Sequence, residues 1–213
     1  LAGLMGSGRS ELARALFGID PIESGEIVVR GRRLDIRGPE DAIAAGFALI
    51  PEDRRAQGLI LDHSVRENLL LPALDRLSRG GFVDDSGGNR LAESLVKKLA
   101  IRLRSVNQPV RLLSGGNQQK VVIAKWLATE PRILIMDEPT AGVDIGTKGE
   151  IVEMIRAFAE AGNGVIIISS ELPELLAVSD RVLILRDGRV DGELERRTIH
   201  SEEQLHHAVQ GVS

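Results

Sequence analysis

Residues Gly3–Ser10, with the sequence GLMGSGRS, decide which fold is expected. Glycines at these intervals let backbone N–H groups turn inward around a phosphate, at the positive end of a following helix. Ser10 could offer its hydroxyl to Mg²⁺, but Arg9 stands where the strict phosphate-loop pattern has a lysine. The stretch therefore predicts a phosphate-binding loop only weakly, and a glycine-rich turn without a ligand is the alternative. Its glycines are Gly3, Gly6 and Gly8.

Outward from this loop, apolar runs of strand length alternate with helical patterns. Such alternation predicts an α/β fold built on a mostly parallel sheet. Residues 64–106 are instead helical in pattern and are expected to form an insertion, interrupted by a loose Gly/Ser/Asp linker near Gly80–Asn89. The other expected elements are a helix over 10–19, a hairpin over 24–36 with Gly31 near its turn, a short helix over 39–46, strands over 47–50, 132–137, 164–169 and 181–190, and a helix over 149–162 whose apolar face is Ile151, Ile155 and Phe158.

The composition excludes several classes of function. A length of 213 residues indicates one domain, or one domain with a small subdomain. A net charge of −4 argues against a nucleic-acid binder, and an aromatic content of 2% argues against a base-stacking platform. The absence of cysteine excludes disulfides and thiolate metal sites. No apolar run approaches the roughly 20 residues of a membrane span, so any membrane role is expected to go through a partner.

Two carboxylates follow the apolar run in RILIMDEPT, residues 132–140. A carboxylate at the carboxyl end of a buried strand can hold Mg²⁺, which is the role expected of Asp137. Glu138 points to the other side of the strand and could polarise an attacking water molecule. The alternative is an acidic strand end that leads into a turn at Pro139.

A second glycine segment, LLSGGNQQK, spans residues 112–120. Ser114 is a natural N-cap residue, and Gly115 and Gly116 leave the first N–H groups of the next helix open to an anion. The alternative is a glycine loop before an apolar helix.

The order of these three motifs resembles that of a known family. An LSGG sequence between a phosphate loop and a DEP strand end resembles the signature of ATP-binding cassette (ABC) ATPases. Nearly the whole chain, to about Asp191, looks like the second, C-terminal cassette of the tandem ATPase subunit of bacterial importers of ribose, galactose, xylose or arabinose. The stretches that carry this likeness are IPEDRRAQGL (50–59), SVRENLLLPAL (64–74), LLSGGNQQK (112–120), DEPTAGVDIG (137–146) and SSELPELL (169–176).

The resemblance implies a single ABC ATPase domain over 1–213, with a P-loop NTPase sheet core, a β-hairpin region and an inserted α-helical subdomain. We expect residues 1–60 and 129–213 to form the nucleotide-binding α/β core and residues 64–128, approximately, to form the helical subdomain that carries the signature. Only Leu1 and Ala2 precede the glycine loop, and the sequence does not begin with Met. We therefore expect the strand before the loop and the aromatic residue that stacks on adenine to be truncated.

The resemblance also implies ATP and Mg²⁺ as cofactors, bound at two shared sites. Two cassettes of this family pair head to tail, so the signature residues Ser114, Gly115 and Gly116 would face the γ-phosphate of an ATP bound mainly by the partner cassette. Asp144 matches the loop through which the two sites sense each other. Residues expected to face the cassette's own ATP are Gly3, Gly6, Ser7, Gly8, Arg9, Ser10 and Glu11; the expected metal ligands are Ser10, Asp137 and Glu52; and the expected catalytic residues are Asp137, Glu138, Glu52 and Ser170.

Three residues depart from the family pattern, and all belong to the cassette's own site. Arg9 is a planar fork where a compact ammonium group is usual. Glu52 replaces a glutamine of the lid loop, and a carboxylate can bind Mg²⁺ but cannot donate a hydrogen bond to a phosphate. Ser170 replaces a switch histidine and is too short to reach the γ-phosphate well; its alternative role is to cap the following helix. We therefore expect this site to turn ATP over slowly.

The expected function is that of an ATPase cassette that powers monosaccharide import from the cytoplasmic face of the bacterial inner membrane. The expected partners are a second cassette, membrane-spanning permease subunits and, indirectly, a periplasmic sugar-binding protein, with no nucleic acid. A non-hydrolysing regulatory cassette of the same transporter is the main alternative. A soluble ABC protein acting on DNA or ribosomes is disfavoured by the short distance from Glu52 to Ser114, and a P-loop kinase would leave LSGG unexplained.

Overall fold

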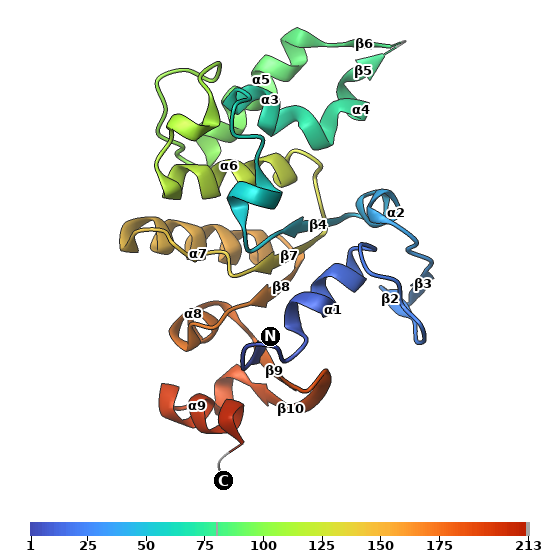
Figure 1. Ribbon diagram of the computed structural model, residues 1–213, viewed down its shortest axis with the longest axis vertical. Coiled ribbons are helices and arrows are strands. Elements are labelled where there is room, and N and C mark those ends of the chain that lie inside the picture. Colours follow the sequence, from blue (N-terminus) through green and yellow to red (C-terminus); the bar gives the residue numbers. More distant parts are fainter. Residues whose placement is uncertain (80, 212–213) are drawn as a thin grey trace.

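A computed structural model describes residues 1–79 and 81–211 of the chain. Strands and helices alternate along most of it, as the sequence predicts (Figure 1). The strands are β1 (Ala2–Gly3), β2 (Ile27–Val29), β3 (Arg32–Leu34), β4 (Phe47–Ile50), β5 (Ser78–Arg79), β6 (Phe82–Val83), β7 (Ile133–Asp137), β8 (Gly164–Ile168), β9 (Arg181–Arg186) and β10 (Arg189–Glu195). The α-helices are α1 (Arg9–Leu16), α2 (Pro39–Ala44), α3 (Val65–Leu70), α4 (Leu74–Leu77), α5 (Asp85–Lys98), α6 (Gly115–Leu127), α7 (Ile145–Glu160), α8 (Leu172–Val178) and α9 (Glu202–Gln210).

Within residues 1–79 and 81–211, the strands and α-helices are accompanied by four short helical turns: the π-helix η1 (Arg54–Gly58) and the 3₁₀ turns η2 (Leu71–Ala73), η3 (Val110–Leu112) and η4 (Arg196–Thr198). The turn η1 follows β4 and begins the connection to the helical section. Its N-cap is Asp53, whose side chain accepts hydrogen bonds from the backbone N–H groups of Arg55 and Ala56.

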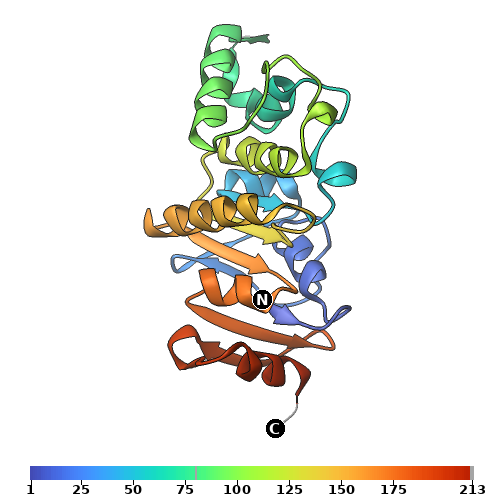
Figure 2. The ribbon, with the colours of Figure 1, turned by 90° about the vertical axis from the view of Figure 1, so that its left-hand side faces the viewer.

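The central strands are mostly parallel, which confirms the predicted α/β class. Strands β4, β7 and β8 pair in parallel in that order, and β1 pairs in parallel with β9, whose other edge carries the antiparallel β10. The nitrogen of Leu1 donates a hydrogen bond to the carbonyl of Ile167 in β8, which places β1 beside β8. Figure 2 shows these strands stacked as one layer, with β4 at one end and β10 at the other.

Alternate residues of β7 face opposite sides of this layer. Leu134 and Met136 belong to one hydrophobic cluster with α6, α7 and α8, whereas Ile135 belongs to a second cluster with α1 and α2. All three side chains are fully buried. A strand covered on both faces has no polar face, and this explains why its sequence is continuously apolar.

The helical section packs α3 against α5 and α6, above the sheet in Figure 1. A capping box fixes the start of α3: the Ser64 hydroxyl accepts the N–H of Glu67, and the Glu67 carboxylate accepts the N–H of Ser64. Buried side chains of α6, including Val121 and Ile123, join this section to the same cluster that covers one face of the sheet.

Three local predictions are wrong. The linker expected near Gly80–Asn89 is helical from Asp85, because Asp84 caps α5 by accepting the N–H of Gly87; Gly80 itself lies outside the described residues. The strand expected over 181–190 is two strands, β9 and β10, because Asp187 and Gly188 both adopt positive φ in the turn between them. The helix over 149–162 begins earlier, at Ile145, where Asp144 is its N-cap.

Candidate active site

The glycine loop connects β1 to α1 and lies on the turn between β9 and β10. Gly6 and Gly8 have φ angles of +78° and +98°, which favour glycine. A Cβ on Gly8 would also lie 3.1 Å from the Cα of Gly188, and the N–H of Gly188 donates to the carbonyl of Ser7 at 3.0 Å. These contacts hold the loop at the N-terminus of α1, where its N–H groups and the helix dipole favour an anion.

A cavity of about 490 Å³ lies at the carboxyl ends of β1, β7 and β8. Ligands of α/β proteins bind at this edge of a sheet. The cavity brings together the predicted residues of the phosphate loop, both strand-end carboxylates, the lid-loop glutamate and the switch-position serine. Its lining residues are Gly3–Glu11, Glu52, Asp137, Glu138, Ala141, Ser169, Ser170, Leu172, His206, Val209 and Gln210.

Asp137 ends β7 and is 6% exposed. Its Oδ1 atom is buried without a hydrogen-bond partner among the described residues. Burial raises the pKa of this carboxyl group, and the neighbouring Ser10 hydroxyl opposes that rise. An unpaired buried carboxylate oxygen is a site that a divalent cation would satisfy, so Asp137 and Ser10 fit Mg²⁺ chemically.

No group of three or more His, Cys, Asp or Glu side chains could hold a metal ion within residues 1–79 and 81–211. This does not contradict a Mg²⁺ site, because Mg²⁺ is usually held by one or two carboxylates together with substrate phosphates and water. Glu52 is exposed after β4 and faces the same cavity as Asp137, so it is available as a further oxygen ligand.

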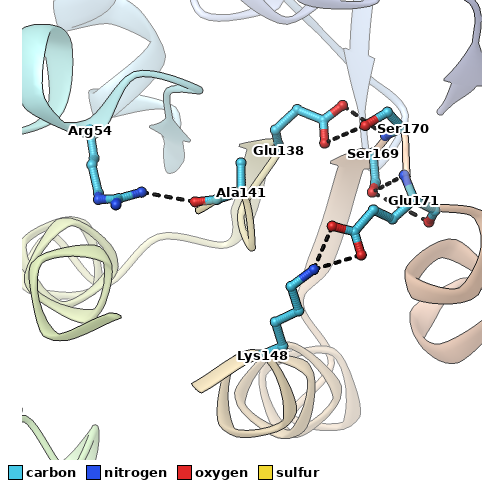
Figure 3. A network of polar contacts seen from close by, with 7 residues as sticks. All are labelled: Arg54, Glu138, Ala141, Lys148, Ser169, Ser170 and Glu171. Carbon is cyan, nitrogen blue, oxygen red and sulfur yellow. Dashed lines mark hydrogen bonds and ion pairs between the residues drawn. The ribbon is translucent and has the colours of Figure 1, made fainter. Parts of the chain in front are cut away.

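Glu138 is held in place by Ser170, which follows β8 (Figure 3). The Ser170 N–H donates to Glu138 Oε1 at 2.7 Å, and the Ser170 hydroxyl donates to Oε2 at 3.2 Å. Burial raises the pKa of Glu138, and the hydrogen bonds from Ser170 oppose that rise. Glu138 adopts a φ of +46°, a strained backbone angle of the kind that occurs at functional sites.

The capping role considered for Ser170 is wrong. The N-cap residue of α8 is Glu171, which makes no side-chain capping bond. Both carboxylate oxygens of Glu171 instead accept hydrogen bonds from Lys148 of α7, and Lys148 Nζ lies 2.7 Å from Oε2 (Figure 3). Ser169 accepts the N–H of Glu171 at 3.0 Å, so the segment 169–171 is fixed on both sides of Ser170.

Arg9 does not point freely into the cavity. Its Nη1 donates to the main-chain carbonyl of Ser169 at 3.1 Å. The guanidinium at the position of the phosphate-binding lysine is therefore partly engaged with the end of β8.

The signature segment begins α6, with Ser114 as the N-cap residue. The Ser114 hydroxyl accepts hydrogen bonds from the N–H and side-chain amide of Asn117. A Cβ on either of the next residues would displace a neighbouring side chain: on Gly115 it would lie 2.8 Å from Arg54 Nη2, and on Gly116 it would lie 2.6 Å from Thr147 Oγ1. Close packing against Arg54 and Thr147 therefore favours glycine at both positions, independently of any anion.

Ser114 and Asp144 share a second cavity, of about 210 Å³. Asp144 caps α7 by accepting the N–H of Thr147 at 3.0 Å and its hydroxyl at 2.8 Å, and these bonds lower the pKa of the Asp144 carboxyl group. None of the residues that line this cavity also lines the phosphate-loop cavity. The two predicted phosphate-binding segments are thus separate within one chain. The lining residues are Arg102, Ser114, Asn117, Lys120, Asp144, Gly146, Thr147 and Glu150.

Several residues at these sites were not predicted. His206, Val209 and Gln210 of α9 line the phosphate-loop cavity, although the last twenty residues carry little recognisable sequence signal. Arg54 contacts the loop that follows Glu138, and nothing in its sequence position indicates this partner. The contact between Arg9 and Ser169 joins residues 160 positions apart, and only the fold brings them together.

Known proteins match this chain in sequence, in fold and in family profile. The Ribose import ATP-binding protein RbsA of Oceanobacillus iheyensis is 46% identical over 211 residues, covering 99% of this chain and 42% of the relative. The protein of that name from Rhodococcus jostii is 50% identical over 202 residues, covering 95% of this chain and 40% of the relative. The chain thus spans about two fifths of the length of these curated relatives.

Solved structures share the fold. A dimeric structure of a post-hydrolysis state of the ATP-binding cassette MJ0796, bound to ADP and Pi, matches with a TM-score of 0.77 and 25% identity, covering 92% of this chain and 84% of that one. A second match is cbiO1 from Clostridium perfringens, with a TM-score of 0.75 and 23% identity, covering 98% of this chain and 80% of that one. The family profile described as ABC transporter matches residues 1–141, which contain the phosphate loop, the LSGG segment and the carboxylate pair. The chain belongs to the ABC transporter family.

Proposed function

We propose that this chain is an ATP-binding cassette that hydrolyses ATP to power the import of a monosaccharide. The observation that carries the proposal is the single cavity in which the phosphate loop, Asp137, Glu138, Glu52 and Ser170 converge. The relatives' names, which describe ribose import and ATP binding, support a sugar as the cargo.

In this proposal, the N–H groups of residues 3–11 bind the phosphates of ATP at the N-terminus of α1. Ser10, Asp137 and Glu52 hold Mg²⁺, which supplies charge neutralisation on the phosphates when bound. Glu138 orients and polarises the attacking water, since burial raises its pKa toward the range useful for a general base. Ser170 keeps the Glu138 carboxylate aimed at the cavity through its two hydrogen bonds.

The cassette acts in a head-to-tail pair. Each ATP with its Mg²⁺ would lie at the interface, between the phosphate loop of one cassette and the signature of the other. Because the phosphate loop and Ser114 line separate cavities, a partner cassette is needed to bring a signature segment to each ATP. Exposed apolar side chains beside the motifs fit such an interface: Met5 is 99% exposed in the phosphate loop, Ile145 is 88% exposed next to Asp144, and Leu112 is 61% exposed before the signature.

The two sites of the pair are unequal in this proposal. Arg9 is engaged by the Ser169 carbonyl, and Ser170 is engaged by Glu138, so both are less available to a γ-phosphate. The signature residues Ser114, Gly115 and Gly116 are intact and would complete the site of the partner cassette. The contact of Arg9 also favours the second candidate function, a non-hydrolysing regulatory cassette of the same transporter.

The cassette would consist of two parts. Residues 1–60 and 129–213 would form the nucleotide-binding core, and residues 64–128, approximately, would form a helical subdomain that receives the membrane-spanning permease subunits. The cassette would then sit at the cytoplasmic face of a bacterial inner membrane, with a periplasmic sugar-binding protein as an indirect partner. None of the helices within residues 1–79 and 81–211 has the length and apolar character needed to cross a bilayer.

The test is Mg-ATP binding and turnover by the full-length protein and its Glu138→Gln variant. We expect tight Mg-ATP binding by both and slow own-site turnover that the variant abolishes. Binding without any turnover at this site would favour the regulatory cassette, and the absence of Mg-ATP binding would refute both functions.

A further inference from the structure

Arg54 contacts two segments that are distant from it in the sequence: the loop 141–142 and the signature at Gly115. It is the first residue of η1, two positions after Glu52 of the phosphate-loop cavity. Its Nη1 donates to the carbonyl of Ala141 at 2.8 Å, and its Nη2 donates to the carbonyl of Gly142 at 3.2 Å. Figure 3 shows the side chain reaching across from its own segment to Ala141.

The same guanidinium packs against the signature. A Cβ on Gly115 would lie 2.8 Å from Arg54 Nη2 and 3.3 Å from the carbonyl of Gly142. The Arg54 head group therefore occupies the space between the signature glycine and the loop 141–142. Its Nε is buried without a partner among the described residues, so its head group is fixed chiefly by the two carbonyls.

The loop that Arg54 contacts runs between the two cavities. Glu138, at one end, lines the phosphate-loop cavity, and Asp144, at the other end, shares the second cavity with Ser114. Gly142 adopts a φ of +64°, so the loop bends at the point where Arg54 binds it. A movement of the Glu52 segment that displaces Arg54 must therefore release the loop 141–142 and the packing of Gly115 together.

We propose that Arg54 is a positioning residue that couples the two nucleotide sites to which this cassette contributes. Arg54 joins the segment that follows Glu52, in the cassette's own site, to Gly115 of the signature and to the loop 141–142 that leads to Asp144. The signature and Asp144 belong to the other site. The coupling of turnover rests on the proposed ATPase function, whereas the physical tether does not. Arginine suits this role because its planar fork donates to two carbonyls at once, which a lysine ammonium at one point cannot reproduce.

The tether is tested first without nucleotide, by hydrogen–deuterium exchange of the full-length protein and its Arg54→Met and Arg54→Lys variants. We expect peptides covering 139–145 to exchange about tenfold faster in Arg54→Met, with an intermediate effect in Arg54→Lys. The matched control is Arg55→Met, because Arg55 is an exposed neighbour with one long contact, 3.4 Å, to Gln118 Oε1. Equal exchange in Arg54→Met and the wild-type protein would overturn the proposal, whatever the result for ATP turnover.

The coupling is tested next in the Glu138→Gln background, where turnover remaining in the full-length protein belongs to the site that this cassette's Ser114 completes. Adding Arg54→Met should lower that remaining kcat about tenfold, with KM changed less than about twofold and with Arg55→Met having no effect. A purely local role of Arg54 in its own site predicts no further loss in this background. Unchanged remaining turnover would therefore refute the coupling even where exchange shows the tether.

Discussion

Glu138 and Ser170 form a two-point contact in which both carboxylate oxygens of Glu138 accept hydrogen bonds from one residue. The N–H bond, at 2.7 Å, is the shorter and comes from the backbone, whereas the hydroxyl bond is 3.2 Å long. The backbone bond survives any substitution at position 170 that keeps the fold, except proline, which has no backbone N–H. The side chain thus adjusts the orientation and acidity of Glu138, and the main chain fixes its position.

Replacing Ser170 with Ala should lower the rate of ATP cleavage at this site about threefold, because one of two orienting bonds is lost. The hydroxyl bond also lowers the pKa of Glu138, so its removal should move the acidic limb of the pH–rate profile to higher pH. The measurement is single-turnover hydrolysis against pH in the full-length protein with the partner cassette's catalytic glutamate replaced. The distant N-cap substitution Ser201→Ala is the control, and an unshifted acidic limb in Ser170→Ala would contradict the role assigned to the hydroxyl.

Replacing Arg9 with Lys should raise turnover at this site severalfold. A lysine ammonium is compact, and the substitution removes the bond between Arg9 Nη1 and the Ser169 carbonyl. Steady-state hydrolysis and Mg-ATP affinity of the full-length protein check this, with Arg14→Lys on the same helix as a control. A fall in turnover would mean that Arg9 itself binds the phosphates and that the asymmetry has another origin.

Replacing Asp137 with Asn should change the thermal stability of the protein and its binding of Mg²⁺ in opposite directions. The buried Oδ1 of Asp137 has no partner among the described residues, and burial disfavours its charge, so the neutral amide should raise the thermal stability of the nucleotide-free protein. The same variant should lose the Mg²⁺-dependent part of the stabilisation by ATP. Differential scanning fluorimetry with ATP, with and without Mg²⁺, measures both effects, and an undiminished Mg²⁺-dependent shift would rule Asp137 out as a ligand.

Glu174 of α8 should make stability fall with rising pH. Its side chain is 7% exposed, and both oxygens are buried without a hydrogen bond of normal geometry among the described residues. Burial raises its pKa above the ordinary 4.5, and the nearby Ser169 and Thr140 hydroxyls oppose that rise only in part. The folded state then binds this proton more tightly than the unfolded state, so stability is present below about pH 4.5 and is lost as pH rises through the raised pKa.

The Glu174→Gln variant is neutral at every pH and should therefore exceed the wild-type protein in melting temperature at pH 8, with the difference shrinking at pH 5. Melting curves from pH 5 to 8 test this, and Glu153→Gln on the exposed face of α7 is the matched control. A difference that stays constant with pH would show that Glu174 does not titrate with folding.

The α/β class of the fold could be predicted from local sequence patterns, and the same patterns supply the candidate site residues, whose roles stay predictions. Continuously apolar runs such as that of β7 predict buried parallel strands, because a strand covered on both faces has no polar side. Glycine spacing in the phosphate loop and LSGG segment, and the strand-end pair Asp137–Glu138, are local patterns whose chemistry follows from residue type and order. The boundaries of α5 and α7 were less predictable, since single caps at Asp84 and Asp144 set them.

Which of these residues meet depends on the packing of strands and helices that are distant in the sequence. The contacts of Arg9 with Ser169, of Glu138 with Ser170 and of Arg54 with Ala141 join positions 32 to 160 residues apart. The placement of α9 beside the phosphate loop and the separation of the two cavities likewise have no local sequence signal. The physical reason is that hydrogen-bond geometry between distant residues depends on how the strands and helices pack, whereas hydrophobic periodicity and turn chemistry act within a few residues along the chain.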